Sequence, residues 1–440
     1  MIDVGLVRAV GTYLVERNRI YRLNRENLLK LAEVRYKKQV KRAYEFVPFY
    51  KNLYKNIDTE KLREFKDFKK LPPVKKDHLR GLPKHQITPR GSKNLLPVST
   101  SGTTGRPLTV YVSFREIIHG LLGYLRGLDS HNINWLKSKI ALVIDLREDS
   151  AETGYIKKGL LSNLPVMFEN ILLLNTNGEP KEILKKLEVF QPDFLGGYTG
   201  MLSHLALLQE KGFGRISPEK VASMGSCLDR KLREFIEKAF NADVFEVYGS
   251  TESGPVAFEC EFGNLHINED MVYLETLGEK TGRVRVTKLY GEGTPILRYD
   301  GMNDIVKLNE KNCGCGIEGK VIEKIYGREN LSIFRRDGGV LTDSVFAKIF
   351  SPLIYKLKTT KVKATKVIQH SLDKIEVKVI IDEKEDDVDE EEILSEIEDN
   401  LKRILGDVEI NIKKVKRLSK RRPMVTSRVN RNEFSRLFYL

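Results

Sequence analysis

Between residues 140 and 248, short apolar runs alternate with longer amphipathic stretches, and this alternation limits the fold more than any other feature. The apolar runs have the length of strands and cover residues 140–144, 171–174, 194–198, 221–225 and 244–248, with helical stretches at 181–190, 201–211 and 229–240. Such alternation predicts β-α-β units that build a parallel sheet with helices on both faces. Short alternating strands follow from 266 to 306, so the sequence predicts an α/β fold with a β-rich lobe.

The two ends of the chain differ from this central part. A helical N-terminal segment covers about residues 1–80, and its clearest helix runs from Asn24 to Phe46, where Pro48 closes it. Near the other end, 375–381 and 408–412 alternate as strands around an acidic amphipathic helix at 390–405. We therefore predict a large N-terminal domain over residues 1–327 and a small α+β domain over 328–440, with the boundary near the Gly-Arg pair that ends at Arg328.

Composition is typical of a soluble chain with a sizeable core. The chain has 440 residues, of which 41% are hydrophobic and 31% charged. No apolar run approaches the roughly 20 residues that span a bilayer. Charges and glycines interrupt the segment from Met1 to Tyr13, so we expect no signal peptide and a cytoplasmic protein. In that compartment, four cysteines argue against a disulfide framework.

The net charge of +14 is concentrated near the C-terminus. Residues 401–440 hold 12 Lys or Arg against 3 acidic residues, a local balance of 12 − 3 = +9. Such a segment suits a nucleic acid, an anionic membrane surface or an acidic carrier, and it equally suits a solvated surface. Because no nucleic-acid motif or interleaved aromatic residues accompany it, we favour the solvated surface and rank nucleic-acid binding last.

A glycine- and hydroxyl-rich segment stands before the alternating region and reads Ser99-Thr-Ser-Gly-Thr-Thr-Gly-Arg-Pro107. Glycines let the backbone approach a ligand closely, and freed N–H groups with short hydroxyls form a nest for phosphate oxygens. Arg106 adds a cation at its rim. The alternative is a flexible linker. Because a strand-like run from Leu108 to Val112 follows, we expect this loop to join two strands rather than a strand and a helix.

A second segment of this kind, Val247-Tyr-Gly-Ser-Thr-Glu-Ser-Gly254, comes directly after an apolar strand. Its position predicts a place at the ligand-binding edge of the parallel sheet. Glu252 is its only acid, and its carboxylate oxygens suit Mg²⁺ bound to phosphate. The alternative is a helix-capping acid.

The order of these two segments, about 150 residues apart, resembles the adenylate-forming acyl and aryl ligases, and most closely the phenylacetate–CoA ligase branch with its CapK-like members. Three further segments agree and lie at 46–50, 259–266 and 313–328. The resemblance covers roughly residues 25 to 430. It implies an AMP-forming ligase with a large AMP-binding domain and a small mobile C-terminal domain, in which Asn330 stands at the usual hinge aspartate.

The same resemblance implies the chemistry and its partners. A small carboxylic acid, aryl or acyl, would react with ATP in the presence of Mg²⁺ to give acyl-AMP. A thiol such as coenzyme A, or an amine or hydroxyl acceptor, would then take the acyl group. The sequence does not identify the acid. Gly196 and Gly197 indicate close backbone approach near Tyr198, where a pocket should lie, but they do not separate aryl from alkyl acids. A homodimer stays open as an assembly state.

The resemblance also implies residue roles. The β- and γ-phosphates of ATP would lie against the first loop, namely Thr100, Ser101, Gly102, Thr103, Thr104 and Gly105, with Arg106 at the rim. Gly249, Ser250 and Thr251 would form the second loop, with Thr251 on the α-phosphate and Glu252 on Mg²⁺. Gly225, Ser226 and Cys227 would line the adenine, on which Tyr248 stacks. Asp304 would bind the ribose with help from Arg328, although a spacing one residue longer than usual leaves Asp300 as an alternative.

The clearest departure from the family is the C-terminal lysine that normally lies over the α-phosphate. Arg428 is the best positional match, and Lys420 is more distant. Arginine keeps the charge but lacks the compact ammonium of lysine. Either Arg428 substitutes, and joins Thr103, Thr251 and Glu252 as a catalytic residue, or adenylation is impaired. In the second case the protein would be a nucleotide-binding regulator or interaction protein derived from a ligase.

Four residues of the β-rich lobe have the donor atoms of a tetrahedral zinc site: Cys260, His266, Cys313 and Cys315. Neighbouring glycines allow tight ligand loops. The alternative is unlinked reduced cysteines beside a surface histidine. The resembled branch carries Cys/His clusters at these places, which favours a structural zinc ion. Cys227 stands apart, and we assign it no thiol chemistry.

Overall fold

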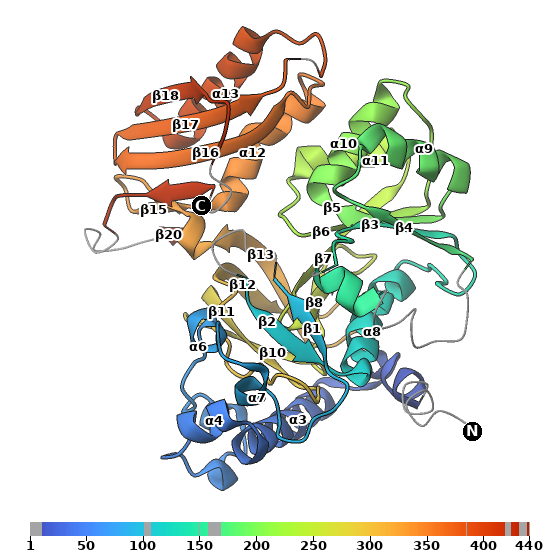
Figure 1. Cartoon of the computed structure of the whole chain (residues 1–440), viewed down its shortest axis with the longest axis vertical. Coiled ribbons are helices and arrows are strands. Elements are labelled where there is room, and N and C mark those ends of the chain that lie inside the picture. Colours follow the sequence, from blue (N-terminus) through green and yellow to red (C-terminus); the bar gives the residue numbers. More distant parts are fainter. Residues whose placement is uncertain are drawn as a thin grey trace.

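The computed structural model describes residues 11–100, 107–148, 150–156, 169–383, 385–418, 424–430 and 438–439. An eleven-stranded mixed sheet forms the centre of the molecule, with helices on both of its faces, and a separate four-stranded sheet lies at one end (Figure 1). The α/β fold predicted from the sequence is therefore confirmed. Among the described residues, none of the helices combines the length and the apolar character that crossing a membrane requires.

The central sheet has the strand order β10-β11-β12-β13-β9-β8-β7-β6-β5-β3-β4. Its parallel part contains β3 (Ile140–Ile144), β4 (Ile171–Asn175), β5 (Phe194–Tyr198), β6 (Lys220–Met224) and β7 (Asp243–Ser250). These bounds agree within a few residues with the predicted strands. The antiparallel part contains β8 (Gly254–Glu259), β9 (Leu265–Ile267), β10 (Val272–Thr276), β11 (Thr281–Lys288), β12 (Asp304–Glu310) and β13 (Lys320–Arg328).

Helices cover the two faces of the parallel strands differently. On one face, α9 (Pro180–Phe190), α10 (Thr199–Glu210) and α11 (Arg230–Phe240) enclose an apolar cluster with side chains such as Val143, Leu195 and Val221. The other face carries α8 (Phe114–Ser130), which begins with a capping box between Ser113 and Glu116. Helix α8 was not among the helices predicted from the sequence.

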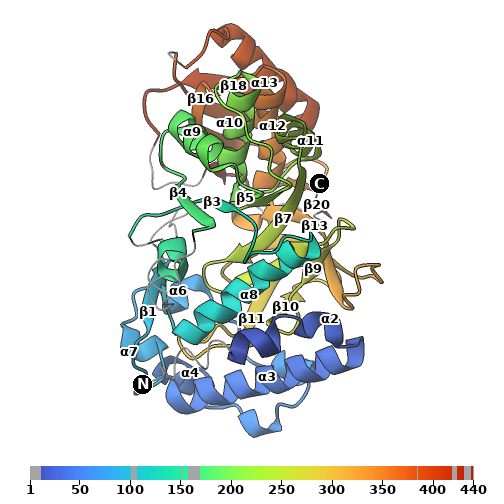
Figure 2. The same ribbon diagram turned by 90° about the vertical axis from the view of Figure 1, so that its right-hand side faces the viewer.

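The helical N-terminal segment packs below the antiparallel strands. It contains α2 (Arg19–Arg22), α3 (Arg25–Phe46), α4 (Pro48–Leu53), α5 (Phe65–Phe68), α6 (Lys76–Leu79) and α7 (Lys84–Ile87). The side chain of Asn24 accepts a hydrogen bond from the backbone N–H of Asn27 and so caps α3, and the helix ends before Pro48, as predicted. One stripe of α3 is buried, and its Tyr36 hydroxyl accepts a hydrogen bond from Thr287 of β11 (3.1 Å). Figure 2 shows α3 at the end of the molecule opposite the four-stranded sheet.

The glycine- and hydroxyl-rich segment joins β1 (Leu96–Ser99) to β2 (Thr109–Val112). These strands pair in antiparallel fashion, with Ser99 opposite Thr109. The prediction that the segment lies between two strands is therefore confirmed. Residues 101–106 of the segment lie outside the described residues.

The C-terminal region has its own sheet and apolar cluster. The sheet has the order β18-β17-β16-β19 and contains β16 (Val362–Ser371), β17 (Lys374–Ile381), β18 (Glu409–Lys414) and β19 (Val425–Ser427). Its helices are α12 (Asp343–Tyr355) and α13 (Glu390–Leu405), and β14 (Ile333–Phe334), β15 (Gly339–Leu341) and β20 (Phe438–Tyr439) form a small separate sheet. The buried cluster of this region draws its residues from 331 onward. A boundary at 327/328 stays a prediction, and β13 ends at Arg328.

A buried ion pair fixes α8 to the antiparallel part of the sheet. The Arg126 guanidinium donates to both carboxylate oxygens of Asp270 at 2.7 Å, and neither side chain is exposed to solvent. Arg126 also donates to the side-chain oxygen of Asn268 (2.9 Å). Burial by itself would raise the pKa of Asp270, but the charge and hydrogen bonds of Arg126 outweigh it and lower that pKa.

Removing one partner of this pair should strongly destabilise the N-terminal part of the chain. We expect Asp270→Asn to lower the free energy of unfolding by about 3–5 kcal/mol, because it leaves the buried Arg126 charge uncompensated. Chemical denaturation followed by the fluorescence of Trp135, the single tryptophan, measures this effect. As a control, Lys30→Ala breaks the exposed pair between Lys30 and Glu26 and should change stability by less than about 0.5 kcal/mol. Equal effects of the two substitutions would contradict the role of the buried pair.

Candidate functional site

A cavity of about 680 Å³ opens at the carboxyl ends of the parallel strands. Parallel sheets bind ligands at this edge because the loops after successive strands converge there. The polar part of its wall comes from segments far apart in the sequence: Lys76, Thr100, Glu152, Tyr198, Gly225, Gly249, Ser250, Thr251, Glu252, Asp304, Arg328 and Asn330. The rest of the wall is predominantly apolar and lies between α8 and strands β3 to β7.

Eight of the residues to which the resemblance assigns a nucleotide or magnesium contact line this one cavity: Thr100, Gly225, Gly249, Ser250, Thr251, Glu252, Asp304 and Arg328. Ser226, Cys227 and Tyr248 flank it and are absent from its wall. Arg428 is exposed beyond β19, where its backbone N–H donates to Gln369 (2.9 Å), and it does not line the cavity. Ser101, Gly102, Thr103, Thr104, Gly105, Arg106 and Lys420 lie outside the described residues.

Glu252 is buried at the centre of the polar wall, with 5% of its surface exposed. The Tyr299 hydroxyl donates to its Oε1 at 2.7 Å, and the Lys76 Nζ lies 3.5 Å from the same oxygen. Lys76 was not predicted as a site residue, because it begins α6 about 175 residues before Glu252 and belongs to none of the glycine-rich motifs. Glu252 and Lys76 therefore place opposite charges side by side within the cavity.

Asp304 is the second acidic group of the wall. The Tyr248 hydroxyl donates to its Oδ2 at 2.8 Å, and the Arg328 Nε lies 3.7 Å from its Oδ1. Burial raises the pKa of Asp304 to about 6, and the nearby carboxylates of Asp343 and Glu252 add to the rise, against the opposing effects of Arg328 and Tyr248. Its carboxylate is thus ionised at neutral pH but incompletely compensated by its neighbours.

Asp304 and the alternative Asp300 have different surroundings in the structure. Asp300 does not line the cavity, and its carboxylate pairs with two arginines of β11. The Nε of Arg283 lies 2.9 Å from Oδ1, and the Nε of Arg285 lies 3.4 Å from Oδ2. Of the two acids that the motif spacing left open, only Asp304 therefore faces the cavity.

A tyrosine–carboxylate pair borders the polar part of the cavity. The Tyr198 hydroxyl hydrogen-bonds to Glu152, and burial raises the pKa of Glu152 above its ordinary value. Gly225 has a φ of +86°, and a Cβ at this position would lie 2.5 Å from the Tyr198 ring. Glycine is therefore required there by both conformation and space. Glu152 belongs to none of the motifs, so no local pattern indicated a role for it.

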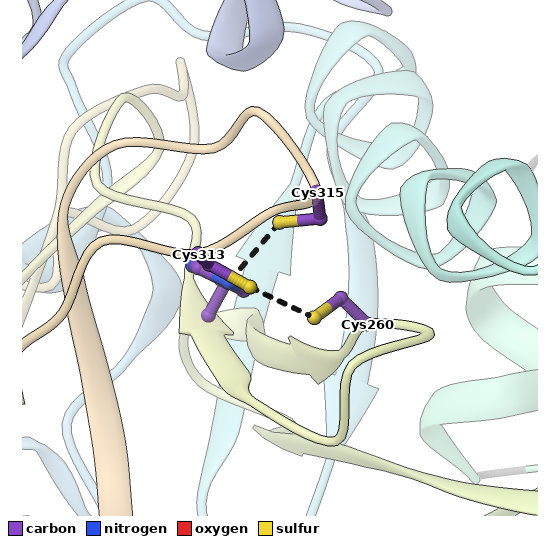
Figure 3. Close-up of side chains that lie close together, drawn as sticks. Cys260, Cys313 and Cys315 are labelled. Atoms are coloured by element: carbon purple, nitrogen blue, oxygen red, sulfur yellow. Dashed lines mark hydrogen bonds between the residues drawn. The ribbon is translucent and has the colours of Figure 1, made fainter.

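The four predicted metal-ligating residues come together in the β-rich lobe. Their donor atoms lie within 4.8 Å of one another. Cys260 follows β8, His266 is on β9, and Cys313 and Cys315 are in the loop between β12 and β13. Figure 3 shows the three thiols gathered at one point. The Sγ atoms of Cys260 and Cys313 are 3.6 Å apart, and the Nε2 of His266 lies 3.3 Å from the Sγ of Cys315.

Tight turns beside the ligand positions and the burial of His266 both suit this cluster to metal binding. Gly263, with φ +72°, and Gly316, with φ +80°, turn the chain beside the ligand positions. Burial lowers the pKa of His266 to about 4, so its imidazole is neutral at physiological pH. The Nδ1 of this ring is buried without a hydrogen-bond partner among the described atoms. A neutral imidazole and three thiols form a donor set that suits zinc.

Comparisons with known proteins find relatives along most of the chain. CapK of Staphylococcus aureus is 25% identical over 368 residues, which is 80% of this chain and 78% of CapK. A phenylacetate–coenzyme A ligase of Thermus thermophilus is 25% identical over 359 residues, which is 75% of this chain and 76% of that ligase. No family model matches the sequence.

Among solved structures, 2-hydroxyisobutyryl-CoA ligase in the postadenylation state, in complex with 2-HIB-AMP, has a TM-score of 0.70 to this chain. The two are 16% identical, and the match covers 90% of this chain and 88% of the ligase. The chain therefore has the fold of the adenylate-forming ligases, and its sequence relatives are CapK and phenylacetate–CoA ligase, as its motifs indicated.

Proposed function

We propose that the protein is an ATP-dependent ligase that activates a carboxylic acid as acyl-AMP and transfers it to a thiol, for which coenzyme A is the leading candidate. The observation that carries this proposal is one cavity whose polar end holds Thr100, Thr251, Glu252, Asp304 and Arg328 and whose other part is apolar. Such a cavity accommodates a nucleotide and an acid with their reacting groups adjacent. The relatives of the chain and the order of its motifs support the same assignment.

The proposed roles follow from the position of each group. Asp304 would accept hydrogen bonds from the ribose hydroxyls, and the Thr100 and Thr251 hydroxyls would contact phosphate oxygens. The buried carboxylate of Glu252 provides hard oxygen donors of the kind that Mg²⁺ prefers. Mg²⁺ bound there would neutralise charge on the phosphates. Lys76, beside Glu252, adds a cation within the cavity itself.

The reaction requires alignment more than covalent help from the protein. The acid carboxylate attacks the α-phosphorus, the bond to the β-phosphate oxygen breaks, and pyrophosphate leaves. The thiol then attacks the acyl carbon and AMP leaves. Holding the reactants in line and neutralising the developing negative charge supply most of the rate. Lys76 is placed to supply positive charge in this structure, whereas Arg428 is exposed outside the cavity.

Acid-dependent exchange of labelled pyrophosphate into ATP tests this function. Glu252→Gln should reduce exchange about 10²–10³-fold, and Lys76→Met about 10²-fold, because each removes charge complementarity at the phosphates. Lys75→Met is the matched control, since Lys75 is the exposed neighbour of Lys76 and does not line the cavity. A protein that binds ATP but shows no exchange with any acid of a broad aromatic and aliphatic panel would instead be a nucleotide-binding regulator.

The pKa of Asp304 gives the proposed ribose site a defined pH dependence. An ionised carboxylate accepts hydrogen bonds from ribose hydroxyls, so the affinity should be highest well above the pKa of about 6 and fall as the pH drops through that value. Between pH 7 and pH 5 we expect the Kd of adenosine to rise about tenfold. Adenosine is the probe because it has no phosphate that titrates in this range.

Two variants sharpen this measurement by calorimetry. Tyr248→Phe removes a hydrogen bond to the ionised carboxylate and should move the midpoint to higher pH, whereas Asp304→Asn should abolish the pH dependence. A wild-type Kd that does not change between pH 7 and pH 5 would count against Asp304 as the ribose acceptor.

We further propose that Cys260, His266, Cys313 and Cys315 hold a structural zinc ion. Zn–S bonds of about 2.3 Å at tetrahedral angles place two sulfurs about 3.8 Å apart. The sulfurs of Cys260 and Cys313 are 3.6 Å apart, which fits this geometry. The ligands tie the loop between β12 and β13 to β8 and β9, so the ion would stabilise the β-rich lobe.

Metal analysis and cobalt substitution test the zinc site. We expect one zinc per chain, and Co²⁺ in its place should show thiolate-to-metal absorption. Zinc added to the apoprotein at about 1,000 times its Kd should raise the free energy of unfolding by about 4 kcal/mol. Cys313→Ser should remove the metal, while Cys227→Ser, which changes the one cysteine outside the cluster, should retain it. Metal content that survives in Cys313→Ser and Cys315→Ser would refute this assignment.

A further inference from the structure

The apolar part of the cavity forms a channel between α8 and the parallel strands. On the helix side, Ile118, Leu125 and Leu128 line it together with Tyr124, and on the sheet side Leu142, Ile144 and Phe194 line it. Leu125, Leu142 and Ile171 are only partly buried, although they pack against a buried apolar cluster. Partly exposed apolar side chains inside a cavity gain contacts when an apolar ligand fills it.

The length of this channel follows from the rise per residue of two elements that line it, α8 and β3. From Ile118 to Leu128, α8 advances ten residues, or about 15 Å at 1.5 Å per residue. From Ile144 to Ile140, β3 spans four residues, or about 13 Å. An extended saturated chain advances about 1.25 Å per carbon, given tetrahedral angles and bonds of about 1.5 Å. The channel therefore matches an unbranched chain of about 10–12 carbons.

Small residues on the sheet side leave room for such a chain. Gly196 lines the channel in the middle of β5, and a Cβ there would lie 2.8 Å from the Leu142 side chain. Ala222 lines it at the corresponding level of β6, because Gly196 and Ala222 are direct partners in the sheet. Of the Gly196-Gly197 pair noted in the sequence, Gly196 therefore lies in the floor of this channel, whereas Gly197 faces Leu202 of α10 on the other side of the sheet.

Charged groups are restricted to the other end of the cavity. Of the described residues that line it, the charged ones are Lys76, Glu152, Glu252, Asp304 and Arg328, all in the polar wall. The far end is lined by Tyr13, Leu128, Trp135, Leu136 and Ile171. An acid with a second charged group at its tail would have to desolvate that group in the channel, which is unfavourable.

We propose that the acid activated by this protein is an unbranched aliphatic carboxylic acid of about 10–12 carbons, bound with its tail toward Trp135. This inference rests on the proposed ligase function and specifies its substrate. The carboxylate would lie near Glu252 and Thr251, and the alkyl chain would run along α8. An aryl acid would fill only the part of the channel nearest the polar wall.

Binding can be tested without catalysis because Trp135 is the only tryptophan in the chain. Bromine quenches tryptophan emission at short range, so bromododecanoates report where each end of the acid lies. We expect ω-bromododecanoate to quench more than half of the emission and α-bromododecanoate to quench much less. Equal quenching by the two, or no saturable quenching by either, would overturn the proposed orientation.

Chain-length dependence of ATP–pyrophosphate exchange tests the same proposal in the reaction. Each methylene buried in the channel should raise kcat/KM about fourfold up to the optimum. Ile171→Phe should shift the optimum to shorter acids and lower the ratio of kcat/KM for dodecanoate to that for octanoate at least about tenfold. Leu172→Phe is the matched control, because Leu172 is the next residue of β4 but packs on the opposite face with α9 to α11, and it should leave this ratio unchanged.

The outcomes of these experiments distinguish failure of the proposed ligase function from failure of the proposed alkyl substrate. Exchange with aryl or short acids that exceeds exchange with decanoate and dodecanoate would overturn the substrate assignment and leave the ligase function standing. Site-specific quenching by ω-bromododecanoate, with no exchange for any acid, would overturn the ligase function and retain an alkyl-binding channel.

Discussion

The cavity exists because α8 is held at a fixed height above the parallel strands. The buried pair of Arg126 with Asp270 anchors the helix, and glycines on one of its faces allow it to approach β8. At Gly123 a Cβ would lie 2.3 Å from Pro255, so no larger residue fits without displacing the helix. With the helix fixed in this way, part of its apolar face lines the cavity opposite β3 and β5, while Leu128 near its C-terminal end packs with Ile140 and Phe194. The space for an acid is therefore a consequence of how the helix is fixed.

The carboxylates at the polar end of the cavity are not fully compensated by the cations of the protein itself. Burial raises the pKa values of Asp304, Glu152 and Asp343, so their carboxylates lack full compensation from neighbouring cations. A site with excess negative charge repels a triphosphate unless cations accompany it. Magnesium at Glu252, the ammonium of Lys76 and hydroxyl donors at Asp304 would supply that compensation. Under the proposed function, such a site would favour a metal-bound nucleotide over a free one.

Much of the fold could be predicted because the parallel strands are apolar runs separated by helices of ordinary length. Asn24 and Pro48 marked the ends of α3 for local reasons of capping and ring geometry. By contrast, α8 was missed although Ser113 and Glu116 form a capping box. The glycines that fit this helix against β8 also weaken its helical signal, because glycine is a poor helix former.

The site was predicted only as far as its residues lie in motifs. Glycine- and hydroxyl-rich loops can be recognised from their composition. Lys76, by contrast, lies beside Glu252 because of tertiary packing that no local sequence pattern indicates. Likewise, spacing alone did not separate Asp304 from Asp300, because the difference lies in which acid meets Arg283 and Arg285. The length of the apolar channel depends on the distance between α8 and β3, and a sequence does not contain that distance directly.

Arg428 could add positive charge to the cavity only if the C-terminal region were placed differently, because here it is exposed outside the cavity. Arg428 follows β19, which is paired with β16, so it moves only with the sheet of the C-terminal region. That region meets α10 through ion pairs of Lys358 with Glu210 and of Lys211 with Asp386. Partly exposed pairs of this kind contribute about 0–1 kcal/mol each, and Ile354 and Tyr355 of α12 add apolar packing against the cluster beneath α10 and α11. Because Lys76 already lies beside Glu252, the cavity has a cation in the present arrangement, whereas a contribution from the exposed Arg428 would require β19 to move.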